Sequence, residues 1–353
     1  MHIPFHRFFK TLQFWILLLI LAGWFDQAPA QQSTMVAIDS LLQKAIVATI
    51  QQKYDRANAF IDTVIAHAPE EPIGYLFRAA TLQSRMLDYE NDADAAVFMK
   101  SLKTCRQLSE KMLHKNPSHA HAHFWLGSAY GYEAFYLGKK RRYIEAVHKG
   151  WKTIQHLETA VRLEPDLYDA YLGIGTYKYY RSKMKLFFLG DESAEGLAMV
   201  RQAATRGKYS RYAAINGLTW MLLDENLVAE AYSMTDSVLQ QFPHSRFFLW
   251  GAAESAARLQ EFERARECYR QIMDSLQEEQ KLSPYLEAVC RTKLARLALR
   301  QEKPQEACAQ LDFIDVQRLS RDAKGKEVAK QMENLRKSCM GIEAASNGRH
   351  SGQ

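Results

Sequence analysis

The sequence has none of the short motifs that would predict a catalytic centre. It contains no G-x-S-x-G nucleophile turn, no glycine-rich phosphate loop of the Walker type and no C-x-x-C pair. LGIGTYKYY has two close glycines, but Gly175 also fits a column of helix-contact residues described below. No stretch alternates polar and apolar residues as a strand does. We therefore expect an all-α protein without enzymatic activity and without a cofactor.

Cysteine is scarce, and its spacing predicts no metal or disulfide framework. The chain has five cysteines, so at least one is left without a partner in the chain. A core of this size does not depend on disulfides. We expect mostly small buried side chains, with Cys105 in a helix-contact column, and the sequence leaves any pairing open. The five are Cys105, Cys268, Cys290, Cys308 and Cys339.

The chain also lacks a strong excess of either positive or negative charge. The net charge is +6 over 353 residues, and basic and acidic residues are interspersed, which does not favour a nucleic-acid partner. The one basic run is KKRR, residues 139–142. It would suit an anionic surface, although a solvated turn between two helices is the simpler interpretation.

The N-terminus has the order of a secretory signal peptide. Arg7 and Lys10 precede the apolar run FWILLLILAGWF, and small residues follow at Ala28 and Ala30. The run is short of the roughly 20 residues that a spanning helix needs. Trp24 follows LAG where a lipoprotein would carry cysteine. We predict cleavage after Ala30, so that residues 1–30 are removed and the mature protein is periplasmic or secreted, without an integral membrane span.

Four prolines mark a repeat. Pro69, Pro117 and Pro165 are each 48 residues apart, and Pro243 follows further along. Ten residues after each proline stands a small residue: Ala79, Gly127, Gly175 and Ala253. A small residue that recurs at one point of a helix indicates that another helix passes close by. We therefore predict a series of packed helix pairs.

A second register gives the repeat length. Ala57 lies twelve residues before Pro69 and Ala231 twelve before Pro243, and Ala231 and Ala265 are 34 residues apart. This period, together with the L-G-x-x-Y spacing in FWLGSAY, resembles the tetratricopeptide repeat (TPR). The resemblance implies a TPR α-solenoid, a right-handed superhelix of antiparallel helix pairs. The 48-residue spacing exceeds the 34-residue period by 14 residues, or about two turns for each helix of a pair. The helices of the early pairs should therefore be longer.

Helix pairs are expected over 36–68, 70–116, 118–164, 166–207, 209–242, 244–278 and 283–317, with a capping helix over 321–339. The solenoid would occupy residues 31–340. The small, polar segment 341–353 should be disordered. The stretch LYDAYLGIGTYKYYRSKMKLFF is also similar to exported bacterial repeat proteins, and distantly to the inclusion-body clearance repeat family, whose relatives add little chemistry.

Four histidines lie within HKNPSHAHAH. His119 and His123 are four residues apart on one helical face, and His114 across the turn could supply a third metal ligand. No nearby glutamate completes an H-E-x-x-H arrangement, and two imidazoles alone bind weakly. Ordinary repeat packing, with His123 largely buried, is the main interpretation, and a periplasmic metal-binding protein is an alternative.

In TPR arrays the first helix of each pair lines a concave groove. Tyrosines are dense in the first helices of two adjacent pairs, and aromatic side chains suit a binding surface, although they also suit a core. The family pattern nominates ten groove residues: His121, Phe124, Thr176, Tyr179, Asn216, Trp220, Trp250, Glu254, Thr292 and Arg296.

These observations predict a non-enzymatic exported scaffold or adaptor. Its groove would bind a protein or peptide partner at the cell envelope. A second alternative from another class is an accessory subunit that binds a small ligand or a cell-wall fragment through the tyrosine cluster. The identity of the partner and the oligomeric state are not accessible from the sequence.

Overall fold

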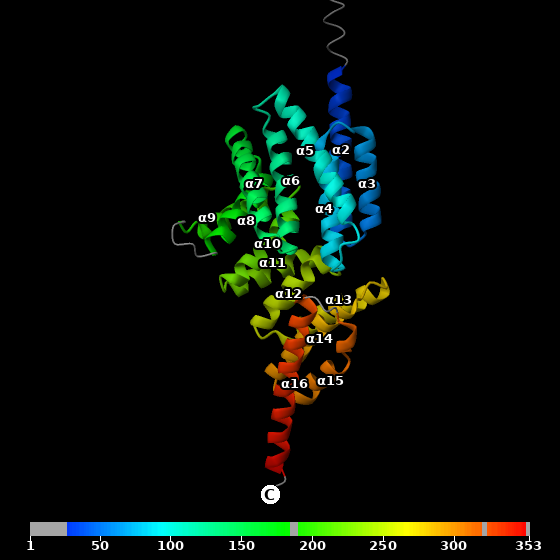
Figure 1. Cartoon of the computed structure of the whole chain (residues 1–353), viewed down its shortest axis with the longest axis vertical. Coiled ribbons are helices and arrows are strands. Elements are labelled where there is room, and N and C mark those ends of the chain that lie inside the picture. Colours follow the sequence, from blue (N-terminus) through cyan, green and yellow to red (C-terminus); the bar gives the residue numbers. More distant parts are fainter. Residues whose placement is uncertain (1–26, 184–189, 320–322, 351–353) are drawn as a thin grey trace, which may run out of the picture.

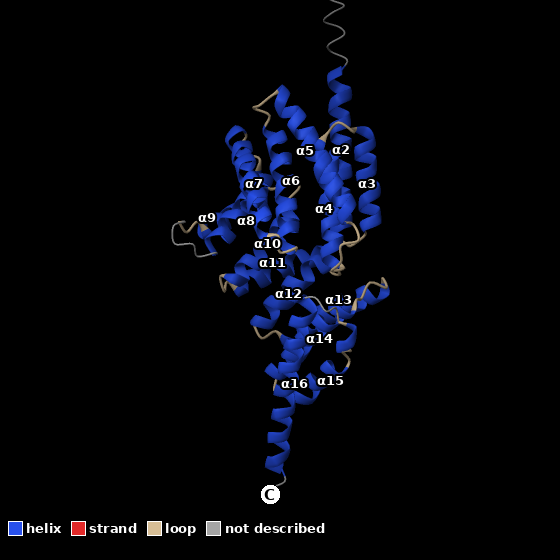
Figure 2. Ribbon diagram, in the orientation of Figure 1, coloured by secondary structure: helices blue, strands red, loops and turns tan. Residues whose placement is uncertain are grey.

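The computed structural model describes residues 27–183, 190–319 and 323–350, with side chains from residue 36 to residue 341. This part of the chain consists of helices and short loops (Figure 2). Most of the predicted signal peptide lies outside it, and Gln27 to Ala30 form the first turn of the first described helix. The signal peptide and its cleavage therefore stay predictions.

The described helices form seven consecutive pairs and a single last helix (Figure 1). Each helix packs most extensively on its neighbours in sequence, as in a solenoid. The predicted fold class is confirmed. The pairs are α2 (Gln27–Ile50) with α3 (Tyr54–His67), α4 (Pro72–Asp88) with α5 (Ala95–Lys115), α6 (Ala120–Lys139) with α7 (Tyr143–Leu163), α8 (Tyr168–Lys183) with α9 (Ser193–Arg206), α10 (Arg211–Asp224) with α11 (Val228–Gln241), α12 (Arg246–Arg258) with α13 (Phe262–Glu278), and α14 (Pro284–Arg300) with α15 (Pro304–Asp312).

Small residues lie where helices approach closely. A Cβ added to Gly127 would meet Leu157 on α7 at 2.9 Å, and one added to Gly175 would meet the carbonyl oxygen of Gly196 on α9 at 2.5 Å. Ala79 and Ala253 are fully buried. Any larger side chain in this column would hold the helices apart. The column of small residues predicted from the prolines is therefore a helix-contact column.

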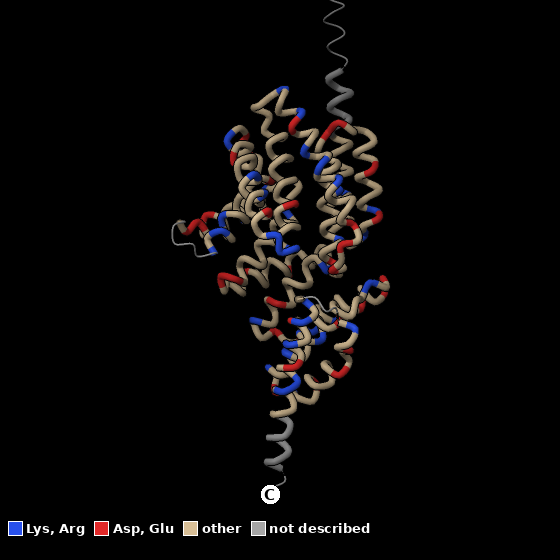
Figure 3. The backbone as a smooth tube through the Cα atoms, in the orientation of Figure 1, with Lys and Arg blue, Asp and Glu red and all other residues tan. Residues whose placement is uncertain are grey.

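The early pairs are taller, as predicted. Helices α6 and α7 have 20 and 21 residues, whereas α10 and α11 have 14 each. The long pairs α2–α7 run close to the long axis of the molecule, and α10–α13 lie across it (Figure 1). Basic and acidic residues are interspersed along the tube (Figure 3).

The turns inside the pairs share one conformation without glycine. In six pairs, a non-glycine residue in the left-handed region follows the first helix. The next N–H then donates to a carbonyl five residues back, as from Lys53 to Ala48 and from Arg142 to Leu137. The six left-handed residues are Gln52, Glu90, Arg141, Asn226, Gln260 and Glu302.

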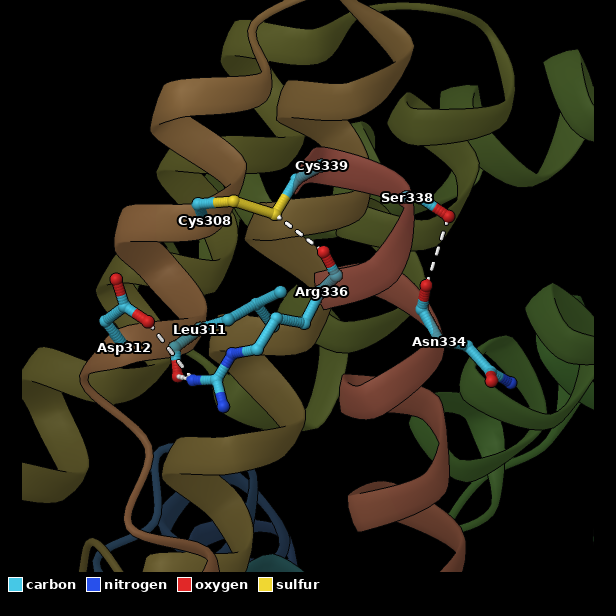
Figure 4. The surroundings of a disulfide bond; sticks show 7 residues. All are labelled: Cys308, Leu311, Asp312, Asn334, Arg336, Ser338 and Cys339. Atoms are coloured by element: carbon cyan, nitrogen blue, oxygen red, sulfur yellow. Dashed lines mark hydrogen bonds and ion pairs between the residues drawn. A yellow bond between two sulfur atoms is a disulfide. The ribbon is translucent and has the colours of Figure 1, made fainter. Parts of the chain in front are cut away.

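The array ends with η1 (Val316–Arg318) and the long helix α16 (Ala323–His350). Cys308 on α15 and Cys339 on α16 form a disulfide (Figure 4). The expectation of mostly apolar cysteines holds for Cys105, Cys268 and Cys290, which are free and buried. The capping helix is longer than predicted, because residues 341–350, expected to be disordered, continue α16.

Candidate functional site

All ten residues nominated for a binding surface lie on first helices of their pairs, from α6 to α14. Eight of them are at least partly exposed: His121, Phe124, Thr176, Asn216, Trp220, Trp250, Glu254 and Arg296. Trp220 has the most exposed aromatic side chain of the set, at 38%. The family pattern therefore places these eight residues where another molecule can reach them.

Tyr179 and Thr292 do not fit the predicted surface. Tyr179 is fully buried, and its hydroxyl donates to the carbonyl oxygen of Met221 at 3.3 Å. Thr292 is 3% exposed, and its hydroxyl has no hydrogen-bond partner among the described residues. Tyr179 therefore packs against α10 of the next pair, and neither side chain is accessible to a partner.

Two cations hold Glu254 between neighbouring pairs. Its carboxylate accepts from Lys293 on α14 at 2.8 Å and from Arg258 on α12 at 3.4 Å. Burial acts to raise the pKa of Glu254, but the two cations outweigh it and lower this pKa. Nearby Trp250 packs edge-on against Tyr269, with 6.1 Å between ring centroids. This part of the surface is therefore pre-organised.

The histidine cluster does not assemble a metal site. The described residues contain no group of three or more His, Cys, Asp or Glu side chains placed to hold a metal ion. His114 is exposed at the end of α5, and His119 caps α6 by accepting from the N–H of Ala122 at 3.2 Å. His121 faces Glu164 at 3.2 Å. The metal-binding alternative is therefore not supported.

His123 instead closes a turn, as Tyr75 and Tyr171 do at the equivalent positions of neighbouring pairs. The hydroxyls of Tyr75 and Tyr171 donate to Pro69 and Pro165, the prolines six residues before them. Nε2 of His123 lies 3.0 Å from the carbonyl oxygen of Pro117 in the same way. All three residues stand six positions after a proline of the repeat, and the structure gives their shared role.

The second nitrogen of His123 contacts His156. The two Nδ1 atoms are 3.0 Å apart. Because a carbonyl oxygen only accepts, Nε2 of His123 donates to Pro117, and Nδ1 of His123 faces the ring nitrogen of His156. Burial, His123 and Lys152 lower the pKa of His156 to about 4. His156 is therefore neutral near pH 7.

The early and late pairs contact each other through a buried arginine. Arg246, at the start of α12, is 1% exposed. It forms two hydrogen bonds to Asp88 at the end of α4 and two to Glu279 after α13, all between 2.7 and 2.9 Å. The hydroxyls of Tyr54 and Tyr89 donate to the same two carboxylates. Sequence reasoning missed this cluster, because the only signal was an arginine directly before FFLW.

A second contact joins the same parts of the chain. Asp39 on α2 binds Lys208 and the hydroxyl of Tyr209, both just before α10. The ring of Tyr209 packs edge-on against Phe77 on α4 at 5.3 Å. Side chains of α2 and α4 therefore contact the residues that lead into α10 and α12. Part of the face predicted to line an open groove is covered by the chain itself.

A pocket of about 500 Å³ lies beside this junction. It is lined by the start of α3, the turn from α4 to α5, and Lys281 from the turn before α14. Arg85 is already bound by Asp94 and Asp55. None of the ten nominated residues lines this pocket.

The basic run Lys139–Arg142 forms the turn between α6 and α7, as expected. Lys139 pairs with Glu90 at 3.3 Å, Lys140 with Asp92, and Arg142 with Glu145. Lys324 at the start of α16 reaches the same Glu90 at 2.5 Å. The longer helices of the early pairs thus bring their turns to the last helix.

Comparison with known proteins gives one partial family match. Residues 41–187, less than half of the chain, match the family model described as regulator of microtubule dynamics protein 1-3. A search of curated protein sequences found no match.

Three solved structures are similar to this chain. A chain of the Cut9–Hcn1 hetero-tetramer of the APC/C gives a TM-score of 0.54 at 12% identity, over 85% of this chain and 55% of that one. The protein therefore spans about half the length of that relative. PilW, a type IV pilus biogenesis factor, gives 0.47 at 13% identity, over 65% and 91%. TTC0263, a TPR protein of Thermus thermophilus, gives 0.40 at 15% identity, over 62% and 98%.

No helix within the described ranges combines the length and apolar character needed to cross a bilayer. One architecture accounts for the 34- and 48-residue spacings in the sequence, for the paired helices and for the similarity to the Cut9–Hcn1 chain. The chain has the all-helical fold of a TPR α-solenoid.

Proposed function

We propose that the protein is a non-enzymatic exported scaffold that binds a protein or peptide partner at the cell envelope. The observation that carries this proposal is the set of partly exposed side chains on successive first helices. Trp220 on α10, Trp250 on α12 and Arg296 on α14 belong to this set. Aromatic and arginine side chains of this kind dominate binding energy at protein interfaces.

The scaffold role agrees with the names of similar proteins, which are structural or regulatory. The partial match is to a family of regulators of microtubule dynamics, and the Cut9–Hcn1 chain is a component of a multi-subunit assembly. We infer a comparable mode of action here, in which a rigid helical array presents a preformed surface.

Export is supported by two independent features. The N-terminal segment has the order of a signal peptide. The Cys308–Cys339 disulfide joins two helices of the cap, and disulfides of this kind persist in oxidising compartments. A periplasmic or secreted location accounts for both.

Site-specific crosslinking tests the proposal. A benzophenone amino acid at position 220 or 296 should crosslink to a partner in an envelope fraction, whereas positions 202 and 270, on exposed faces of the second helices α9 and α13, should not. A purified partner should bind the Trp220→Ala variant roughly tenfold or more weakly, with an unchanged Tm. Equal crosslinking at all four positions would place the binding surface elsewhere.

A small-ligand function through the tyrosine cluster has less support. Tyr130 and Tyr179 are buried, and Tyr171 closes a turn, so these rings serve the core. A small ligand that stabilised the protein and crosslinked at none of the four positions would favour that alternative.

A further inference from the structure

We propose that the exposed apolar face of α7 docks the protein onto an anionic lipid surface. This face, here called the α7 stripe, comprises Tyr143, Ile144, Val147 and Trp151. It lies apart from the side chains assigned above to partner binding, so the proposal goes beyond the scaffold function.

The four side chains are unusually accessible for their type. Ile144 is 89% exposed, Tyr143 and Val147 are both 63%, and Trp151 is 54%. Residues 144, 147 and 151 are spaced by three and four positions, so they share one face of the helix. Soluble proteins expose single apolar residues freely, but contiguous apolar surface usually marks an interaction site.

The stripe is not the packing face of α7. That face is marked by Thr153 and Leu157, which lie against Gly131 and Gly127 of α6. Gly150 lies against the ring of Tyr177 on α8. The stripe points away from these contacts, and the side chains described leave it open to solvent.

Basic residues flank the stripe. The segment 139–152 contains six lysines and arginines and a single acidic residue, Glu145. Four of the six cations are ion-paired: Arg142 with Glu145, Lys139 with Glu90, Lys140 with Asp92 and Lys149 with Glu133. Arg141 and Lys152 have no carboxylate within ion-pair distance among the described residues, although Lys152 lies over the ring of Tyr130. Each cation near an anionic bilayer strengthens binding by about fivefold.

The shape of the stripe favours a bilayer over a folded partner. It is a convex ridge on one helix, whereas peptide recognition by helical surfaces uses a groove. An amphipathic helix with aromatic and branched side chains between cations inserts its apolar face into the headgroup region. Tyrosine and tryptophan are the residues enriched at that depth.

The test uses a fluorophore on the stripe. The three free cysteines are buried, so a maleimide dye should react selectively with Val147→Cys, and with Leu259→Cys as the control in an exposed turn. Vesicles containing phosphatidylglycerol should shift the emission of the dye to the blue at position 147 only. Pure phosphatidylcholine vesicles should shift it little. This readout is local, so residues 1–30 cannot imitate it.

Two sets of variants separate the apolar and electrostatic contributions. Ile144→Ser with Trp151→Ser should weaken sedimentation with anionic vesicles by roughly tenfold or more. Leu227→Ser with Leu259→Ser, exposed leucines in other turns, should not. Arg141→Gln with Lys152→Gln should weaken it and flatten its salt dependence. Glutamine holds the same left-handed turn position at Gln52 and Gln260, so Arg141→Gln keeps the turn.

Three results would overturn the proposal. The same vesicle-induced emission shift for dyes at positions 147 and 259 would show that the stripe does not contact lipid. A dimer in light scattering that Ile144→Ser with Trp151→Ser abolishes, without vesicle binding, would make a second copy the occupant. A lower Tm of that variant, with unchanged vesicle binding, would show that the stripe packs on the chain itself. None of these results bears on crosslinking at position 220, so the two proposals fail separately.

Discussion

Arg246 and Asp88 are 158 residues apart in sequence and form a buried bidentate ion pair. Nε binds Oδ1 at 2.9 Å and Nη2 binds Oδ2 at 2.7 Å. This geometry fixes the guanidinium plane as well as the distance. The pair joins the end of α4 to the start of α12, so the solenoid is held at a defined curvature by charge as well as by neighbour packing.

Replacing Arg246 with methionine should destabilise the fold by about 3–5 kcal/mol, because Asp88 and Glu279 would be left charged without their shared cation. Urea unfolding of Arg246→Met measures the loss. Arg270→Met on the exposed face of α13 is the matched control and should change stability by less than about 0.5 kcal/mol. Similar unfolding midpoints for the two variants would mean that the buried cluster contributes little.

Gly175→Ala should destabilise the protein by about 2–3 kcal/mol, since the new methyl group would meet the backbone oxygen of Gly196, which cannot rotate away. Gly138→Ala on α6 has only a 4.0 Å contact with Ala146, and it should stabilise by about 0.5–1 kcal/mol through its higher helix propensity. Thermal unfolding should therefore shift in opposite directions for the two substitutions. Shifts of the same sign would contradict the close approach of α8 and α9.

Stability should fall as the pH drops from about 6.5 to about 4, in part through His156. Its folded pKa is about 4, below that of an unfolded histidine, so the unfolded state binds the proton first. The contribution should be about 1–2 kcal/mol, less than the full shift implies, because the ring is only half-buried. Urea unfolding of His156→Gln should show a correspondingly weaker pH dependence. His244→Gln, at an exposed histidine, is the control variant.

A thiol assay tests the disulfide. Unreduced protein in denaturant should titrate three thiols, and reduced protein five. The closed segment of 31 residues predicts a stabilisation of about 3–4 kcal/mol by the chain-entropy argument. Hydrogen exchange of Cys308→Ser with Cys339→Ser should therefore speed up in α15 and α16 but not in α4–α7. Five thiols without reductant would contradict the bond.

The sequence alone determined the class of fold and the position of almost every helix pair. Local signals sufficed, because proline can begin a helix but not continue one, and because small residues mark helix contacts wherever they occur. The turns inside the pairs carried no such signal, since Gln52, Glu90 and Arg141 occupy left-handed positions that usually hold glycine.

Only the tertiary structure decided which faces are free. Tyr179 and Trp220 looked alike as surface aromatics, but one is buried between α8 and α10 and the other is exposed. The contact between Asp88 and Arg246 depends on the total rotation of the solenoid over five pairs. Local sequence patterns do not specify this rotation. The open α7 stripe is decided in the same way, because a helix period shows which side chains share a face but not whether another helix covers it.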